Sequence, residues 1–170
     1  MNVIDILLKK DPVISRLTKK YLLDQRVKYH EEGYIERYLH LYDTSTKMWG
    51  HGIYRPKWIS THYTMMELAY MEINPKHKIY QEALKHLLEY EWYDQGLASK
   101  NRHQDMCVTA MLLSLATYGH STDEKIHEMI DYMLDHTMPD GGWNCLWERK
   151  PAPKISSVHT TLSVLEAFKR

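Results

Sequence analysis

The sequence predicts an all-α fold of α/α toroid type, built from repeated helical hairpins, and three observations carry this prediction. Apolar residues recur at helical spacing along most of the chain, whereas alternating β-branched runs, which would indicate strands, are missing. A polar N-cap residue followed four places later by Thr opens an apolar helix three times, at Ser60, Asp105 and Ser157. These copies start roughly 50 residues apart, which is typical of helical repeats that stack side by side.

The first 44 residues carry the signals of one helical pair. Asp11-Pro12, an N-cap residue followed by proline at the first helical position, predicts a helix that runs through Leu22. A stripe of apolar and aromatic residues predicts a second helix from about Glu31 to Tyr42. We therefore expect a single domain over residues 1–170, with an N-terminal helical pair in 1–44 and helical repeats in 45–170.

In the repeats, each of the first two signature helices is followed by an outer helix. The first signature helix is expected at about Thr61–Met71, and Asn74-Pro75 supplies an N-cap and an N1 proline for the outer helix that follows. Asp105 is expected to cap the second signature helix. This helix ends at Gly119, a residue suited to the left-handed position after a helix.

Residues 121–124, with the sequence Ser-Thr-Asp-Glu, predict a capping box for the outer helix of the second repeat, over 126–134. The third repeat has the same start but no outer helix after it. Ser157 then opens the last signature helix, whose apolar pattern continues through Leu162, Leu165 and Phe168. The array is therefore expected to end on an unpartnered helix.

Long loops are expected near Tyr93–Gln104 and Met138–Ile155, and loops of this length are usually functional or heavily packed. The second loop contains Gly141-Gly142-Trp143, and a weaker echo of it, Trp49-Gly50-His51-Gly52, precedes the first signature helix. Adjacent glycines permit positive φ and a tight turn, while a tryptophan can plug the seam between consecutive helix pairs.

The composition excludes several classes of function. Lys and Arg together number 22, as do Asp and Glu, so no electrostatic footprint for nucleic acid or anionic lipid is present. No apolar run is long enough to span a membrane, and the first ten residues lack a signal-peptide pattern, which predicts a soluble cytosolic protein. The two cysteines, Cys107 and Cys145, do not make a disulfide framework and are expected to be reduced.

The repeat also predicts where a function lies. His62, Cys107 and His159 each stand two places after the N-cap residue of a signature helix. If the three helices stack, these side chains occupy equivalent first-turn positions on one concave surface.

Several segments carry a resemblance to a known family. Tyr132-Met133-Leu134, then Asp140-Gly141-Gly142-Trp143 and residues 154–165 (KISSVHTTLSVL) resemble the repeat of the terpenoid cyclase and protein prenyltransferase superfamily, whose members are α/α toroids. Residues 53–64, 105–109 and 140–145 are similar to segments of bacterial proteins labelled prenyltransferase or squalene cyclase-like. The resemblance implies an inner ring of parallel helices around a central cavity that holds an apolar, isoprenoid-type ligand.

Departures from this superfamily limit what the resemblance implies. The acidic DxDD and DDxxD motifs of its cyclases and prenyl synthases do not occur in the chain. The ring of these proteins needs about six hairpins, so the chain resembles half of a ring, and the apolar edge of such a half marks an association surface. We therefore expect a second copy of the chain to cover this edge and close the ring in a homodimer.

A zinc site is a further implication. Protein prenyltransferases hold zinc with an Asp, a Cys and a His, and the chain resembles them at Asp140, Cys145 and His159, although the spacing departs from theirs. Cys107 is an added metal candidate, because the first turn of a helix lowers the pKa of a thiol. Asp105 and His159 are the candidate catalytic residues. The candidate substrate-binding residues are Trp49, Tyr54, Lys57, His62, Trp143 and Trp147.

Each of these residues also has a structural interpretation. Ser60, Asp105 and Ser157 can be N-caps alone, the histidines and Cys107 can be packing residues, and the tryptophans can join helices. Two classes of function remain: an enzyme-like ring that holds an isoprenoid ligand, and a non-catalytic scaffold that binds a peptide or protein partner. A polar cluster converging on a deep pocket favours the first, whereas dispersed His62, Cys107 and His159 favour the second.

Overall fold

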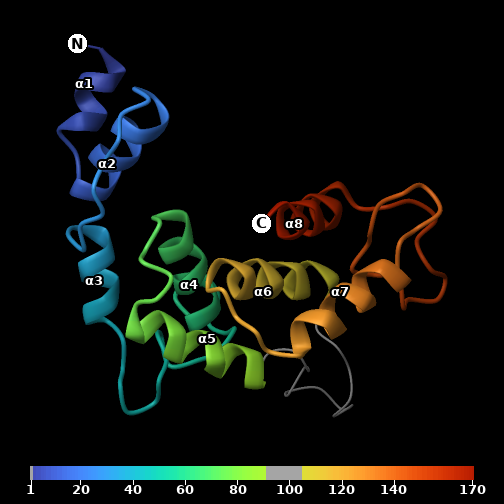
Figure 1. Cartoon of the computed structure of the whole chain (residues 1–170). Helices are drawn as coiled ribbons and strands as arrows, with labels where there is room; N and C mark the ends of the chain where they lie inside the picture. Colours follow the sequence, from blue (N-terminus) through green and yellow to red (C-terminus); the bar gives the residue numbers. More distant parts are fainter. Residues whose placement is uncertain (1, 91–104) are drawn as a thin grey trace.

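The computed structural model of the chain describes residues 2–90 and 105–170. In these residues every regular element is a helix, as the sequence predicts, and one isolated β-bridge joins Asp43 and Met48. Figure 1 shows a body of helices with the N-terminal helices standing at one side of it. Among the described helices none has the length and apolarity that crossing a membrane requires. The predicted loop at Tyr93–Gln104 lies outside the described residues.

The N-terminal helices are α1 (Val3–Leu8), α2 (Pro12–Tyr21) and α3 (Tyr34–His40). Helix α1 was not predicted, and α3 is shorter than the expected second helix because it begins only after Gly33, whose φ is +70°. The Asp11 carboxylate accepts hydrogen bonds from the N–H groups of Val13 and Tyr34, at 3.0 and 3.2 Å. The predicted cap of α2 therefore also fixes the start of α3.

The first hairpin of the body consists of α4 (Thr61–Tyr70) and α5 (Lys78–Tyr90). Helix α4 begins where the signature predicts, but α5 begins after the predicted Asn74-Pro75 start. The Asn74 side chain accepts a hydrogen bond from the Lys76 N–H at 3.0 Å and so closes a turn of its own. The prediction of this start was wrong because Asn serves turns as readily as helix caps.

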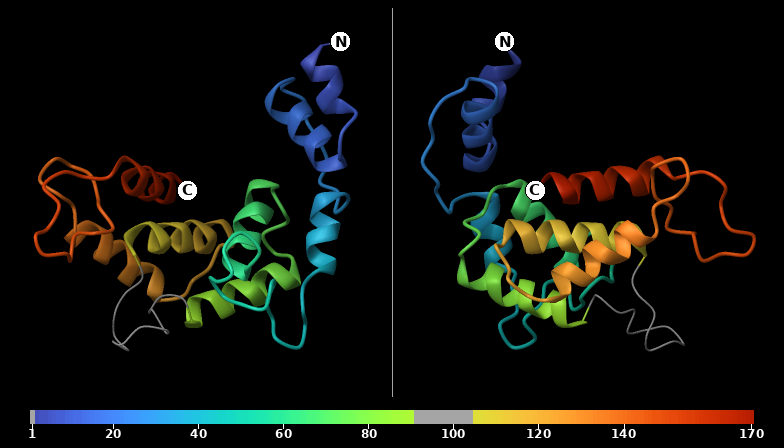
Figure 2. Two further views of the ribbon diagram at one scale, coloured as in Figure 1. Left: turned by 180° about the vertical axis from the view of Figure 1, so that it is seen from behind. Right: turned by 45° about the vertical axis from the view of Figure 1, so that its right-hand side comes forward.

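The second half of the body contains α6 (Met106–Tyr118), α7 (Lys125–Asp135) and α8 (Val158–Lys169). Helix α6 is the centre of the molecule, since it contacts α4, α5, α7 and α8. Its own core residues include Leu112 and Leu115, which pack with Leu68 of α4, Met129 of α7 and Val164 of α8. Figures 1 and 2 show α8 lying along α6 and running in the same direction.

Gly119 ends α6 as predicted, but not in the predicted conformation. Its φ is −75°, and the left-handed residue is His120, with φ +52°. A Cβ atom on Gly119 would lie 2.4 Å from Leu84 Cδ2. The glycine is therefore needed for the close approach of α6 to α5, which the local sequence does not reveal.

The predicted capping box of α7 does not form. The N-cap is Glu124, which makes no side-chain cap bond, and Asp123 instead accepts from the Lys125 N–H at 3.0 Å. Ser157 does cap α8, because its hydroxyl accepts a hydrogen bond from the Thr160 N–H at 3.3 Å. Ser60 and Asp105 occupy the N-cap positions of α4 and α6 without a side-chain cap bond.

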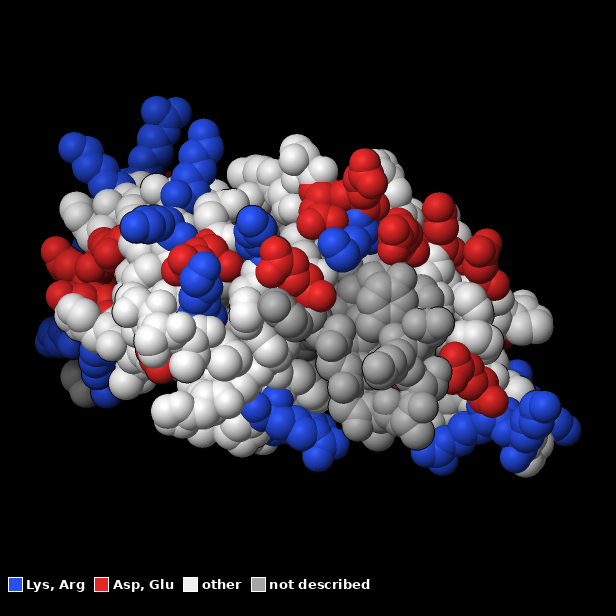
Figure 3. Space-filling view, turned by 90° about the horizontal axis from the view of Figure 1, so that it is seen from below, with Lys and Arg blue, Asp and Glu red and all other residues white. Residues whose placement is uncertain are grey.

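The charged side chains are mixed on the surface. On the face shown in Figure 3, Lys and Arg side chains are interspersed with Asp and Glu side chains. This distribution agrees with the equal numbers of acidic and basic residues in the sequence.

Candidate functional site

The amino-terminal ends of the signature helices carry the predicted candidate residues. With N-caps at Ser60, Asp105 and Ser157, the residues His62, Cys107 and His159 all occupy the second helical position. The ends of α6 and α8 lie at the same end of the molecule in both ribbon views. The equivalence in helix position is confirmed.

Two tryptophans join loops to helices in the same way. The indole N–H of Trp49 donates to the Tyr38 carbonyl at 2.6 Å, and that of Trp143 donates to the Met133 carbonyl at 2.6 Å. Both side chains are buried. They occupy the seams between consecutive helices, as their structural interpretation predicts, and their part in substrate binding stays a prediction.

The backbone of each tryptophan is held by a threonine, but in a different register. The Trp49 N–H donates to Thr61 Oγ1 and the Trp143 N–H to Thr161 Oγ1, each at 3.0 Å. Thr61 is the first residue of α4, whereas Thr161 is the fourth residue of α8. Relative to its tryptophan loop, α8 therefore extends about one turn further than α4.

This shift gives the two predicted histidines different surroundings. His62 is fully buried, and its ring contacts those of Tyr54 and Tyr63, with centroids 5.3 Å away in both cases. His159 is exposed to solvent and Cys107 is half-buried. Residues that share a position in the sequence repeat thus do not share one environment.

Cys145 connects the ends of α6 and α8. Its Sγ accepts a hydrogen bond from the Cys107 N–H at 3.2 Å and another from the Thr160 hydroxyl at 3.3 Å. The Cys145 side chain is half-buried, and so is that of Cys107. The sequence named both cysteines, but no local signal indicated that they meet across 38 residues.

The two thiols have opposite pKa shifts. The hydrogen bond from the Cys107 thiol, helped by those from Thr160 and the Cys107 N–H, outweighs burial and lowers the pKa of Cys145 from the usual 9.0 to about 6. The same bond, together with burial and the charges of Cys145 and Asp105, raises the pKa of Cys107. The Val108 N–H at the start of α6 does act to lower the pKa of Cys107, as expected, but the contact with Cys145, burial and the nearby charges outweigh it.

The predicted metal ligands are not brought together as one set. In residues 2–90 and 105–170 no group of three or more His, Cys, Asp or Glu side chains is placed to hold a metal ion. Asp140 accepts a hydrogen bond from the Ser156 N–H at 2.8 Å, which lowers its pKa. Two thiols alone do not complete the four-ligand shell that zinc requires, so the zinc site stays a prediction.

An aromatic group lies beside Cys145. The Trp147 indole N–H donates to the Tyr132 hydroxyl at 3.2 Å, and the Trp147 ring lies 3.8 Å from that of His136. Burial raises the pKa of Tyr132, which also senses the charges of Cys145 and Asp105. Trp147, a predicted substrate-binding residue, is thus hydrogen-bonded to a tyrosine that senses the charge of Cys145.

The remaining predicted residues lie at the start of α4. The Tyr63 hydroxyl donates to the Tyr54 hydroxyl at 3.1 Å, and Lys57 is exposed in the loop before the helix. Asp105, the predicted catalytic acid on α6, is exposed as well. Their roles in binding or catalysis stay predictions.

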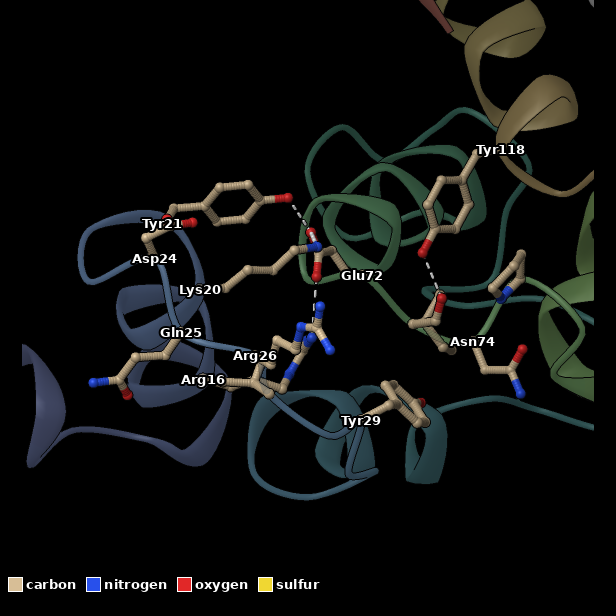
Figure 4. A pocket seen from close by; sticks show the side chains of 13 residues that line it. Arg16, Lys20, Tyr21, Asp24, Gln25, Arg26, Tyr29, Glu72, Asn74 and Tyr118 are labelled. Carbon is tan, nitrogen blue, oxygen red and sulfur yellow. Dashed lines mark hydrogen bonds and ion pairs between the residues drawn. The ribbon is translucent and has the colours of Figure 1, made fainter.

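A cleft of about 1030 Å³ lies elsewhere, between the N-terminal helices and the turn after α4 (Figure 4). None of the predicted site residues lines it. Its walls include three tyrosines and three basic residues, which are Tyr21, Tyr29, Tyr118, Arg16, Lys20 and Arg26.

Glu72 occupies the middle of this cleft (Figure 4). Its carboxylate accepts from Arg16 at 3.1 Å, from Lys20 at 2.6 Å and from the Tyr21 hydroxyl. The glutamate thereby neutralises part of the basic charge on α2. Sequence analysis missed the cleft because Arg16 and Glu72 are 56 residues apart and belong to no motif.

Helix α8 presents two unlike faces. One face carries the buried Val164 and Ala167, which belong to the core around α6. The other is a stripe at helical spacing formed by Val158, Leu162 and Leu165, whose exposed fractions are 87%, 56% and 53%; we call it the α8 stripe. The predicted apolar pattern of the last helix thus remains largely open to solvent.

Comparison with known proteins adds no assignment. No family model matches the chain, and neither a curated protein nor a solved structure matches it.

Proposed function

We propose that the chain is a helical-repeat scaffold of partial α/α-ring architecture that associates with a second copy of itself through the α8 stripe. The exposure of Val158, Leu162 and Leu165 on one face of a helix is the observation that carries this proposal. A contiguous apolar surface of this kind is typical of an association site. The dispersed surroundings of His62, Cys107 and His159 also favour a scaffold over a catalytic pocket.

The shape of the stripe suits a two-fold partner. In an isologous dimer the same patch meets itself, so an antiparallel pair of α8 helices with Leu162 at the axis would set residue 166 beside residue 158 of the other copy. Full burial of a Val or Leu side chain contributes about 1.5–3 kcal/mol, and the exposed part of the stripe supplies a share of this in both copies. Since association itself costs at least about 4 kcal/mol, a dimer of roughly micromolar affinity is expected.

The charges beside the stripe are complementary in this arrangement. His159 and Glu166 are seven residues apart and therefore lie on the same flank of the stripe, and both are exposed. Antiparallel pairing brings Glu166 of one copy next to His159 of the other, twice across the axis. Antiparallel helix dipoles add a small favourable contribution.

The proposal is tested by the mass of the full chain in solution, measured by sedimentation and light scattering over a range of concentrations. We expect twice the 20.3 kDa chain mass for the wild type and the single-chain mass for Leu162→Glu, which places two carboxylates at the axis. Leu134→Glu on α7, whose parent side chain is 55% exposed, is the matched control and is expected to remain a dimer.

A second variant tests the same interface independently, in case Leu162→Glu does not fold. His159→Glu alters an exposed side chain and places like charges beside each other across the proposed axis, so it is expected to weaken the dimer at least several-fold. A wild type that stays monomeric, or a dimer that survives both Leu162→Glu and His159→Glu, would refute the proposal.

The isoprenoid ligand and the zinc ion stay predictions of the family resemblance. The aromatic group of Tyr132, His136 and Trp147 is one described surface that an apolar ligand would contact. It is not needed for the scaffold function proposed here.

A further inference from the structure

Two cysteines lie at the amino-terminal ends of α6 and α8, and hydrogen-bond donors converge on the sulfur of one of them. Cys107 lies in the first turn of α6, and Cys145 comes from the loop between α7 and α8. The Cys107 N–H and the Thr160 hydroxyl both donate to the Cys145 sulfur. A sulfur that accepts an N–H at the start of a 13-residue helix is placed where negative charge is stabilised.

The second cysteine is close enough to take part. The Cys145 sulfur lies 3.2 Å from the Cys107 backbone nitrogen, so it stands directly beside the residue that carries the second thiol. Because the N–H and hydroxyl donors both face Cys145, we assign Cys145 as the anionic partner and Cys107 as the protonated one. Both side chains are half-buried, which leaves the pair accessible from solvent while limiting its hydration.

One charged group near the pair opposes an anionic Cys145 but is outweighed. Asp105 at the start of α6 acts to raise the pKa of both thiols, yet the hydrogen bonds to Cys145 outweigh it. Tyr132 of α7 senses the charge of Cys145 and has Trp147 and His136 against its ring. Glu148 acts on Tyr132 from the loop before α8.

We propose that Cys145 and Cys107 form a thiol–disulfide exchange site, in which Cys145 attacks a small disulfide and Cys107 resolves the product. This inference is independent of the scaffold function. The substrate class is a low-molecular-weight disulfide, which is the oxidant in the reaction.

The first step forms one bond and breaks one. The Cys145 thiolate attacks one sulfur of the disulfide RS–SR, a Cys145–S–SR bond forms, the S–S bond of the substrate breaks, and RS⁻ leaves and takes a proton from water. Cys145 then carries no negative charge. The Cys107 thiol then no longer faces a negative charge on Cys145, while its burial and the charge of Asp105 remain.

The second step closes the pair. Cys107 releases its proton to water, its sulfur attacks Cys145 Sγ, the bond to SR breaks, and a second RS⁻ leaves and is protonated. Counted from the thiolate–thiol pair, the chain has then lost two electrons and one proton to give a Cys107–Cys145 disulfide, and the second proton taken up by the two RS⁻ groups comes from water. The substrate disulfide has been reduced to two RSH molecules.

The experiment uses the reduced full chain with oxidised glutathione in the presence of a chelator, followed by acid quenching and intact mass spectrometry. The wild type is expected to form an internal disulfide with little glutathione adduct. Cys107→Ser keeps the N–H donor and the nucleophile but lacks the resolving thiol, so it should accumulate one adduct. Cys145→Ser should react more slowly than Cys107→Ser by on the order of 10-fold at neutral pH.

A pH profile separates an activated thiolate from an ordinary cysteine. In Cys107→Ser, alkylation of Cys145 by iodoacetamide should reach half its maximum below the pH at which Cys107 does so in Cys145→Ser. Thr160→Val, which removes one donor from Cys145, should shift the Cys145 profile to higher pH while circular dichroism shows the helices retained. Equal profiles for the two single-cysteine variants, or a wild type that yields no internal disulfide, would overturn the proposal.

Discussion

Trp143 shows how much of this structure depends on single side chains. Its indole N–H donates to the Met133 carbonyl of α7 and its backbone N–H to Thr161 of α8, so one residue joins two helices and a loop. Its carbonyl also accepts from the Ser157 N–H at 2.8 Å, at the start of α8. A buried donor with this many contacts has no substitute among apolar residues of similar size.

Trp143→Phe should therefore lower the free energy of unfolding. The substitution keeps an aromatic ring but removes the indole donor from the Met133 carbonyl, which keeps only the longer bond from the His136 N–H at 3.4 Å, and this loss costs about 1 kcal/mol. Urea unfolding followed by circular dichroism measures the loss. Trp58→Phe is the matched control, because Trp58 is 76% exposed and should change stability by less than about 0.5 kcal/mol. Equal losses in the two variants would contradict the joining role of Trp143.

At the scale of the element, the loop before α8 uses its two glycines for different reasons. Gly141 has φ +84° and open space where a Cβ would stand. Gly142 has no unusual φ, but a Cβ there would lie 2.6 Å from Ser156 Cβ and equally close to Thr161 Oγ1. The first glycine forms the turn predicted from the sequence, and the second lets the loop approach α8.

These reasons predict unequal costs for alanine. Gly141→Ala pays only the strain of a left-handed residue, about 1–2 kcal/mol. Gly142→Ala displaces Ser156 and Thr161, and this overpacking costs about 1–3 kcal/mol of folding free energy. It also weakens the hydrogen bond from the Trp143 N–H to Thr161, which adds to the loss. Thermal unfolding of both variants should rank Gly142→Ala as the less stable. The reverse order would show that turn conformation, rather than close approach, controls this loop.

At the scale of the molecule, Glu72 holds the N-terminal helices on the body. Arg16, whose side chain is only 9% exposed, and Lys20 both reach from α2 to this carboxylate. Burial acts to raise the pKa of Glu72, but the hydrogen bonds from Lys20 and Tyr21 outweigh it and hold the pKa below 4.5. The charged form is therefore the one that stabilises the contact.

The sign of the pH dependence follows from this lowered pKa. Stability from Glu72 is fully present above pH 4.5, its ordinary pKa, and is lost as the pH falls through the lower folded value. Glu72→Gln should lower the free energy of unfolding by about 1–2 kcal/mol at neutral pH, and this difference should shrink in acid. Urea unfolding across pH measures it, with the exposed Glu32→Gln as control. If the difference in unfolding free energy between the wild type and Glu72→Gln stayed constant down to about pH 3, the charge of Glu72 would not be its cause.

The sequence by itself determined that the regular elements in the described residues are helices and where most of these helices begin. Apolar spacing and N-cap residues are local signals, and α2, α4, α6 and α8 start where those signals predict. The joining role of the tryptophan loops was also foreseen as an interpretation. The starts of α5 and α7 were less well predicted, since Asn74 and Asp123 bond their own turns rather than a helix end.

Only the tertiary structure decided the chemistry. Cys145 receives the N–H of Cys107, Arg16 meets Glu72, and α8 extends one turn past the register of α4, which buries His62 and exposes His159. These outcomes depend on contacts between residues far apart in the chain. Local patterns fix backbone hydrogen bonds within a few residues, whereas packing of whole helices sets which side chains become neighbours and how each is solvated.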